Sequence, residues 1–269
     1  MKLRYDPYQV FRSSQTPAGL YARQKWLDEA NTPTWQTDFD ETVKALFAGQ
    51  LPDGSWQRSV MTTISRLFGL HLTVRATDSR IEDALNWLSN KMQGYIDAID
   101  NHSVPDIESA ELEGLPFVSS EPVMLITGGT LFLCSIFNRQ HDPAILAVYH
   151  RLNSDDFIRE DLARDTASMH NIFRALVVHP VYAHEGLVAE IVDIYAGLQN
   201  TKGDWGNRLP FYQTMNALAQ LNLPDAEVQL EHAFPRLLET QHTDGTWGRH
   251  DREWNTFLCI HALKNKGML

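Results

Sequence analysis

Cysteine is scarce in this sequence. Only Cys134 and Cys259 occur among its 269 residues, and each lies within an apolar run. Two cysteines cannot provide the set of disulfides that stabilises a small secreted domain. Because a free cysteine usually behaves as a small core hydrophobe, we expect two buried thiols and a cytoplasmic protein.

Clusters of basic residues and long apolar runs are also missing. The formal net charge is −11, and no window holds a dense run of lysine or arginine. Nucleic acids and anionic membrane surfaces are bound mainly through such clusters, so we expect neither as a partner. The longest uncharged stretch, residues 122–138, contains Gly128 and Gly129 and falls short of a membrane span, which favours a buried helix. The N-terminus has no apolar signal core.

Several recognisable catalytic motifs are absent as well. The sequence contains no phosphate-binding loop, no dinucleotide-binding glycine pattern and no Gly-x-Ser-x-Gly motif, so we predict no cofactor. Apolar residues make up 43% of the chain, which is enough for one large core. Because no stretch has the composition of a linker, we predict a single domain over residues 1–269.

Three segments share the pattern Gln-x3-Gly-x-Trp. The glutamines of the second and third segments are 42 residues apart, and those of the first and second are separated by about three periods of roughly 50, typical of stacked helical repeats. We expect the glycine to end a helix at positive φ, the tryptophan to pack under the next helix, and the glutamine amide to bond backbone groups at helix ends. The motif residues are Gln50, Gly54 and Trp56; Gln199, Gly203 and Trp205; and Gln241, Gly245 and Trp247.

Each motif lies between two predicted helices. In the last of these helices, Trp254, Phe257 and His261 fall on one face. Strand-like alternation of useful length is missing, and the segment 101–116 is expected to be a long loop. We therefore predict an all-α fold of eleven or twelve helices. The predicted helices include residues 42–48, 60–72, 79–99, 122–138, 143–152, 155–178, 185–198, 210–221, 228–239 and 254–263.

A Gln-x3-Gly-x-Trp motif between two helices resembles the repeat of the squalene and oxidosqualene cyclases. Protein prenyltransferase β subunits share the same hairpin plan. The resemblance covers most of residues 40–267 and implies an α/α toroid, a double ring of helical hairpins around an apolar cavity. It also implies that the helix after each motif tryptophan is an inner helix and that the helix before each glutamine is an outer one.

The catalytic signatures of these families are not matched. Cyclases that begin by protonation carry Asp-x-Asp-Asp at the start of an inner helix. Here Asp38, Asp40 and Glu41 precede the first motif, and we expect them to begin an outer helix, where acidic residues are ordinary. Prenyltransferases bind zinc through an Asp-x-Cys pair, which is absent, and Cys259 and His261 lie about 200° apart around a helix. We therefore predict no bound metal.

Two polar clusters lie at or near the starts of expected inner helices, within residues 161–170 and 250–253. An acid in an apolar cavity has a raised pKa and could protonate an alkene or an epoxide; capping and surface ion pairing are the alternatives. We hypothesise that the clusters converge on one mouth of the ring, with aromatic rings below them. The catalytic candidates are Asp165, Asp251, His170 and Glu253, and the ligand-binding candidates are Phe211, Tyr212, Trp254, Phe257, His250 and Asp161.

Three functions are compatible with this pattern. The first is binding of an apolar, isoprenoid-like small molecule in the central cavity, with or without cyclase-like or transferase-like chemistry. The second is a non-catalytic binding or interaction scaffold. The third is a glycan lyase or hydrolase, since helical toroids also serve sugar chemistry in open, acid-lined grooves. A fold alone does not decide among them, and the sequence does not indicate the oligomeric state.

Overall fold

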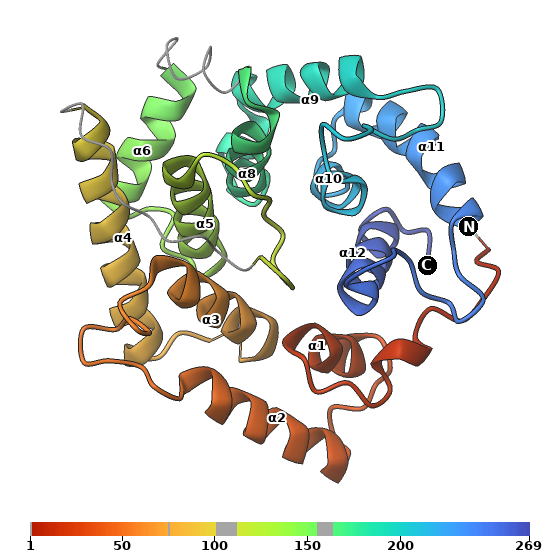
Figure 1. The fold of residues 1–269 in the computed structure, drawn as a ribbon, viewed down its shortest axis with the longest axis horizontal. Coiled ribbons are helices and arrows are strands. Elements are labelled where there is room, and N and C mark those ends of the chain that lie inside the picture. Colours follow the sequence, from red (N-terminus) through yellow and green to blue (C-terminus); the bar gives the residue numbers. More distant parts are fainter. Residues whose placement is uncertain (1, 75, 101–111, 155–163) are drawn as a thin grey trace. The chain divides into compact units, whose positions relative to one another are not determined.

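The computed structural model describes residues 2–74, 76–100, 112–154 and 164–269. These residues form eleven α-helices, two short 3₁₀-helices and no β-strand, which confirms the predicted all-α class (Figure 1). The helices are α1 (Pro17–Lys25), α2 (Pro33–Phe47), α3 (Val60–Thr73), α4 (Ser79–Asp100), α5 (Pro122–Ile136), α6 (Pro143–Ser154), α8 (Thr166–Leu176), α9 (Gly186–Leu198), α10 (Phe211–Leu218), α11 (Pro224–Glu239) and α12 (Arg252–Asn265), with η1 (Gln9–Phe11) and η2 (Tyr182–His184).

The chain divides into two compact units. Unit 1 consists of Met1–Leu46 and Val192–Leu269, and unit 2 consists of Phe47–Ile191. The division falls inside α2 and inside α9. Among the described residues, no helix combines the length and the apolar composition that crossing a membrane requires.

Helix α5 forms the core of unit 2. All its residues from 125 to 135 are buried, and it packs against α3, α4 and α8. At Gly128 the backbone of α5 approaches α8 so closely that an added Cβ would lie 2.5 Å from the carbonyl oxygen of Asn171. Gly128 therefore permits close packing of α5 against α8, because the position has no room for a side chain.

Helix α12 has the corresponding place in unit 1. Residues 256–260 are buried, and the helix packs against α1 and α10. Both cysteines are buried as predicted, Cys134 in α5 and Cys259 in α12. Burial raises the pKa of Cys134 to about 11 and that of Cys259 well above its ordinary value, so both thiols are protonated at neutral pH.

Some helix limits differ from those predicted. Helix α1 was not predicted; it begins with Pro17 after the capping hydroxyl of Thr16. Helix α2 begins at Pro33 rather than near residue 42, because the Thr32 hydroxyl accepts a hydrogen bond from the first turn. Helix α11 continues through the exposed Pro235, which removes only one backbone donor. The predicted start of the helix at residue 155 lies outside the described residues, and α8 begins at Thr166.

Candidate functional site

The three Gln-x3-Gly-x-Trp segments make the same local hydrogen bonds. The amide nitrogen of Gln50 donates to the carbonyl of Gly54 (3.0 Å) and to that of Arg80 in α4 (2.8 Å). The amide nitrogen of Gln199 donates to the carbonyl of Gly203 (3.3 Å) and to that of Gln229 in α11 (2.9 Å). In both segments, the second acceptor lies 30 residues after the glutamine. Each amide therefore links the turn that carries the motif to a following helix.

The third motif makes this link to a non-helical segment near the N-terminus instead of a helix. The amide nitrogen of Gln241 donates to the carbonyls of Gly245 (3.0 Å) and Tyr5 (3.1 Å). Its amide oxygen accepts hydrogen bonds from the backbone nitrogens of Arg4 (3.1 Å) and Tyr5 (3.2 Å). The N-terminal segment of unit 1 thus occupies, at this motif, the place that a helix occupies at the other two.

The motif glycines and tryptophans are packed without spare room. Gly54, Gly203 and Gly245 have φ between +76° and +90°, and an added Cβ at any of them would lie within 2.4 Å of neighbouring backbone. Each lies in the turn, five to seven residues after the preceding helix ends, so the expectation that the motif glycine ends a helix is wrong. The tryptophans Trp56, Trp205 and Trp247 are at most 2% exposed, which confirms their predicted burial. The indole nitrogens of Trp205 and Trp247 donate to the carbonyls of Tyr195 (3.1 Å) and Leu237 (2.7 Å) in the preceding helix.

The polar residues at the start of α12 separate into two kinds. His250 and Asp251 are exposed, and Asp251 precedes the helix at a positive φ of 46° without a capping bond from its side chain. The Glu253 carboxylate, by contrast, accepts hydrogen bonds from the hydroxyls of Ser14 (2.8 Å) and Thr16. Since Thr16 also caps α1, this carboxylate joins the N-terminal ends of α1 and α12.

The predicted ligand-binding aromatics of unit 1 form two groups. Phe257 stacks on Trp254 (5.2 Å between ring centroids) and lies 5.1 Å from the Trp26 ring and 5.3 Å from that of Tyr21. His261 stacks on the same phenyl ring at 5.9 Å. Trp254 and Phe257 are buried, whereas Tyr21, Trp26 and His261 are partly exposed. We call these five residues the α12 aromatic group.

The second group surrounds α10. Phe211 lies 6.1 Å from the Trp205 ring and 5.3 Å from that of Tyr212, and the Arg236 guanidinium lies over Phe211 at 5.6 Å. Burial raises the pKa of Tyr212 to about 12. Phe211 therefore packs against a motif tryptophan.

His261 is a polar member of the α12 aromatic group and lies on the helix face predicted to hold it with Trp254 and Phe257, but it was not predicted to bind a ligand. The side-chain amide of Asn216 in α10 lies 3.2 Å from His261 Nδ1, and that of Gln220 lies 3.5 Å from it. Asn216 itself is 2% exposed and also donates to the Leu258 carbonyl (3.2 Å). A sequence signal existed, because Asn216 and Gln220 are four residues apart within the helix predicted at residues 210–221, although α10 ends at Leu218.

The candidates of unit 2 lie on α8. Asp165 is the N-cap of this helix: its carboxylate accepts hydrogen bonds from the Ala167 backbone nitrogen (3.1 Å) and the Ser168 hydroxyl (2.5 Å). His170 is fully buried, and its burial, together with the nearby charge of Arg174, lowers its pKa to about 3. It is therefore neutral at physiological pH. Asp161 lies outside the described residues.

The two polar clusters belong to different compact units. Glu253 and its neighbours lie in unit 1, and Asp165 and His170 lie in unit 2. Their convergence on one mouth of a ring therefore remains a prediction.

The acidic string at residues 38–41 has a structural role at its first member. Asp38 lies in the body of α2, and its carboxylate accepts hydrogen bonds from the buried guanidinium of Arg23 (2.7 Å) and from Gln15 (2.7 Å). Arg23 also donates to Glu29 (2.8 Å). The hydrogen bonds from Arg23 and Gln15 lower the pKa of Asp38. Its expected place at the helix start is wrong, because α2 begins five residues earlier, at Pro33.

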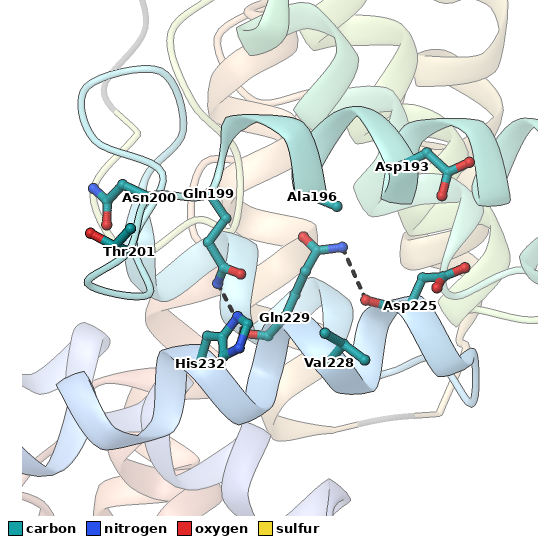
Figure 2. Close-up of a pocket in the computed structure, with 9 residues that line it drawn as sticks. All are labelled: Asp193, Ala196, Gln199, Asn200, Thr201, Asp225, Val228, Gln229 and His232. Atoms are coloured by element: carbon teal, nitrogen blue, oxygen red, sulfur yellow. Dashed lines mark hydrogen bonds between the residues drawn. The ribbon is translucent and has the colours of Figure 1, made fainter.

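A surface groove of about 360 Å³ lies between α9 and α11 (Figure 2). Among the residues predicted from sequence, only the motif residue Gln199 lines it. The lining residues are Asp193, Ala196, Gln199, Asn200, Thr201, Asp225, Val228, Gln229 and His232. In the described part of the chain, histidine, cysteine and acidic side chains do not gather in a group of three or more that could hold a metal ion.

The chain matches no protein-family model and no curated protein. It is similar in structure to a protein from Actinoplanes that is known from a crystal structure. The two align over 96% of this chain and 90% of that chain, with a TM-score of 0.52 and 14% sequence identity. A likeness at this level of identity concerns the fold alone.

The function must therefore be argued from the side chains. Unit 1 combines a partly exposed aromatic group on α12 with a carboxylate, Glu253, one turn before Phe257 on the same helix. Aromatic faces bind apolar and cationic carbon skeletons through dispersion and through the ring quadrupole. Such a surface suits an apolar molecule with a polar end.

Proposed function

We propose that this chain is an α/α toroid protein related to the terpenoid cyclases and protein prenyltransferases, and that it binds an apolar, isoprenoid-like molecule. The observation that carries the proposal is the shared geometry of the three Gln-x3-Gly-x-Trp segments. Each glutamine bonds the carbonyl of its own motif glycine and a carbonyl of a neighbouring segment, and each tryptophan is buried.

The proposed binding surface is the α12 aromatic group. Tyr21, Trp26 and His261 keep part of their surface exposed around the buried Phe257 ring. The methyl-branched carbons of an isoprenoid chain would pack on these rings. The hydroxyl end of such a molecule would lie toward Glu253, which already accepts two hydroxyl hydrogen bonds.

The proposal is for binding and leaves catalysis unassigned. Protonation of an alkene needs a carboxylic acid whose pKa is raised by apolar surroundings. Glu253 is instead held by two hydroxyls, Asp165 caps a helix, and Asp251 is exposed. His170 has its pKa lowered to about 3 and is not a proton donor at neutral pH.

Farnesol is a suitable probe, because it is uncharged and carries the isoprenoid skeleton with one hydroxyl. We expect saturable binding with one site per chain, measured by equilibrium dialysis and by tryptophan fluorescence. Phe257→Leu keeps an apolar side chain but removes the ring face, and it should weaken binding about tenfold. Phe39→Ala is the control, since this ring lies on α2 and stacks on Trp35 (4.8 Å).

Two results would contradict the proposal. One is the absence of saturable farnesol binding by the folded protein. The other is an equal loss of farnesol affinity in the Phe257→Leu and Phe39→Ala variants when both have native circular dichroism spectra. Binding of maltohexaose in place of farnesol would favour the sugar-directed alternative.

A further inference from the structure

The groove between α9 and α11 contains a buried hydrogen-bond acceptor without a donor. Gln229, on α11, is 2% exposed, and its amide nitrogen donates to the carbonyls of Val192 (2.9 Å) and Asp225 (3.2 Å). Because both of these partners are acceptors, the nitrogen must point toward them. The amide oxygen Oε1 is thereby left buried and receives no hydrogen bond from the described residues. An acceptor in this state costs folding free energy unless a ligand or water supplies a donor.

A second amide oxygen lies at the same end of the groove. The nitrogen of the Gln199 amide is committed to the carbonyls of Gly203 and Gln229, so its oxygen is free to accept. Figure 2 shows the oxygens of Gln199 and Gln229 turned toward each other between the two helices. At the third motif, the corresponding oxygen of Gln241 accepts two backbone N–H groups.

Two carboxylates give the groove a negative charge. The carboxylates of Asp193 and Asp225 lie on α9 and α11 at the other end, and both residues are exposed (Figure 2). Lysine and arginine are absent from the described lining residues. Val228, 51% exposed, gives the groove an apolar patch on α11. The groove therefore offers two neutral acceptors, two anionic acceptors and a short apolar surface.

We propose that this groove binds a guanidinium group on an aliphatic stem, either an arginine side chain of a peptide or a small arginine-derived amine. A guanidinium carries five N–H donors in one plane and pairs with carboxylates in a fork. An ammonium group carries its three N–H donors on one nitrogen, so it is less suited than a guanidinium to bond several acceptors that lie apart from one another. The stem would lie on Val228, and the planar head would bond the Gln199 and Gln229 oxygens and one carboxylate. This inference does not depend on the proposed isoprenoid site.

The experiment uses isothermal titration calorimetry with the full chain at low ionic strength. The probes are N-acetylarginine methylamide, agmatine, N-acetyllysine methylamide and N-acetylcitrulline methylamide, the last being an uncharged analogue with nearly the same shape as arginine. We expect the arginine compound or agmatine to bind at least tenfold more tightly than the lysine and citrulline compounds. Tighter binding of the arginine compound indicates a peptide source, and tighter binding of agmatine indicates a free amine; each supports a guanidinium site.

Two single variants locate the site. Asp193→Asn and Asp225→Asn are tested singly, and the variant that removes the carboxylate paired with the guanidinium should weaken binding about tenfold, because it removes a charge-assisted acceptor. Glu231→Gln is the matched control: it removes the same charge from an exposed position of α11 that does not line the groove, and it should change affinity less than twofold. Equal affinity for arginine and citrulline compounds, no binding of either guanidinium compound, or effects of both the Asp193 and Asp225 variants no larger than that of the Glu231 variant would overturn the proposal.

Discussion

Replacement of Trp247 by alanine is the most direct test of the motif as a structural device. Its indole is fully buried, and the indole nitrogen donates to the Leu237 carbonyl at 2.7 Å. Truncation of a buried tryptophan to alanine typically costs about 3–5 kcal/mol through lost burial and the remaining cavity. The Leu237 carbonyl would also lose a hydrogen bond, which places the expected loss at the upper end of this range.

The expected decrease in the free energy of unfolding of Trp247→Ala is large, because the total free energy of unfolding of a domain is about 5–15 kcal/mol. In a chain of this size it corresponds to a fall in melting temperature of about 10 °C or more. The assay is thermal and urea unfolding followed by circular dichroism. Trp87→Ala is the control, because this tryptophan of α4 is only partly buried and should cost less. A Trp247→Ala melt within 2 °C of the parent, or no lower than that of Trp87→Ala, would refute the reasoning.

Two further predictions follow from the backbone of the second motif and from the core of unit 2. Gly203→Ala should destabilise far more than Gly206→Ala in urea unfolding: both residues have positive φ, but only at Gly203 would a Cβ meet a carbonyl oxygen, that of His232, at 1.9 Å. Gly206→Ala should cost about 1–2 kcal/mol for its φ alone. Because burial lowers the pKa of His170 to about 3, its contribution to stability is complete above about pH 6.5 and is lost as the pH falls toward 3. When the pH falls from 7 to 5, the free energy of unfolding should decrease by about 2 kcal/mol less in the His170→Gln variant than in the parent protein. Equal decreases in the two proteins, measured by urea unfolding, would contradict the lowered pKa of His170.

The helices were predictable where the sequence repeats a local rule. The helix predicted at residues 60–72 forms as α3, and the helix predicted at residues 228–239 forms as α11, which begins four residues earlier, at Pro224. The start of α2 was not predicted, although Thr32 caps its first turn and Trp35, Phe39 and Val43 recur at four-residue intervals, because polar residues fill most positions between these three. Local patterns thus identified elements better than their limits.

The polar contacts of the candidate sites depend on residues far apart in the chain. Arg23 pairs with Asp38, and Glu253 accepts hydrogen bonds from Ser14 at a sequence separation of 239 residues. No single-sequence period encodes such a pairing. The free amide oxygen of Gln229 could not be predicted from the sequence for a related reason. The orientation of this amide is decided by its hydrogen bond to the Val192 carbonyl, which lies on another helix. Candidate chemistry could be predicted from residue type, but its partners could not.

The motif also explains how such a fold can persist while its sequence changes. The partners of the three glutamines are backbone groups: the carbonyls of Arg80 and Gln229, and the carbonyl and N–H groups of the segment at Tyr5. A backbone acceptor survives any substitution of its own side chain, so only the glutamine, glycine and tryptophan need to be kept. A helical fold held in this way depends less on the side chains of the segments that the glutamines contact. The same freedom means that the side chains around Phe257 and in the groove of α11 are not dictated by the fold, and they are where function has to be tested.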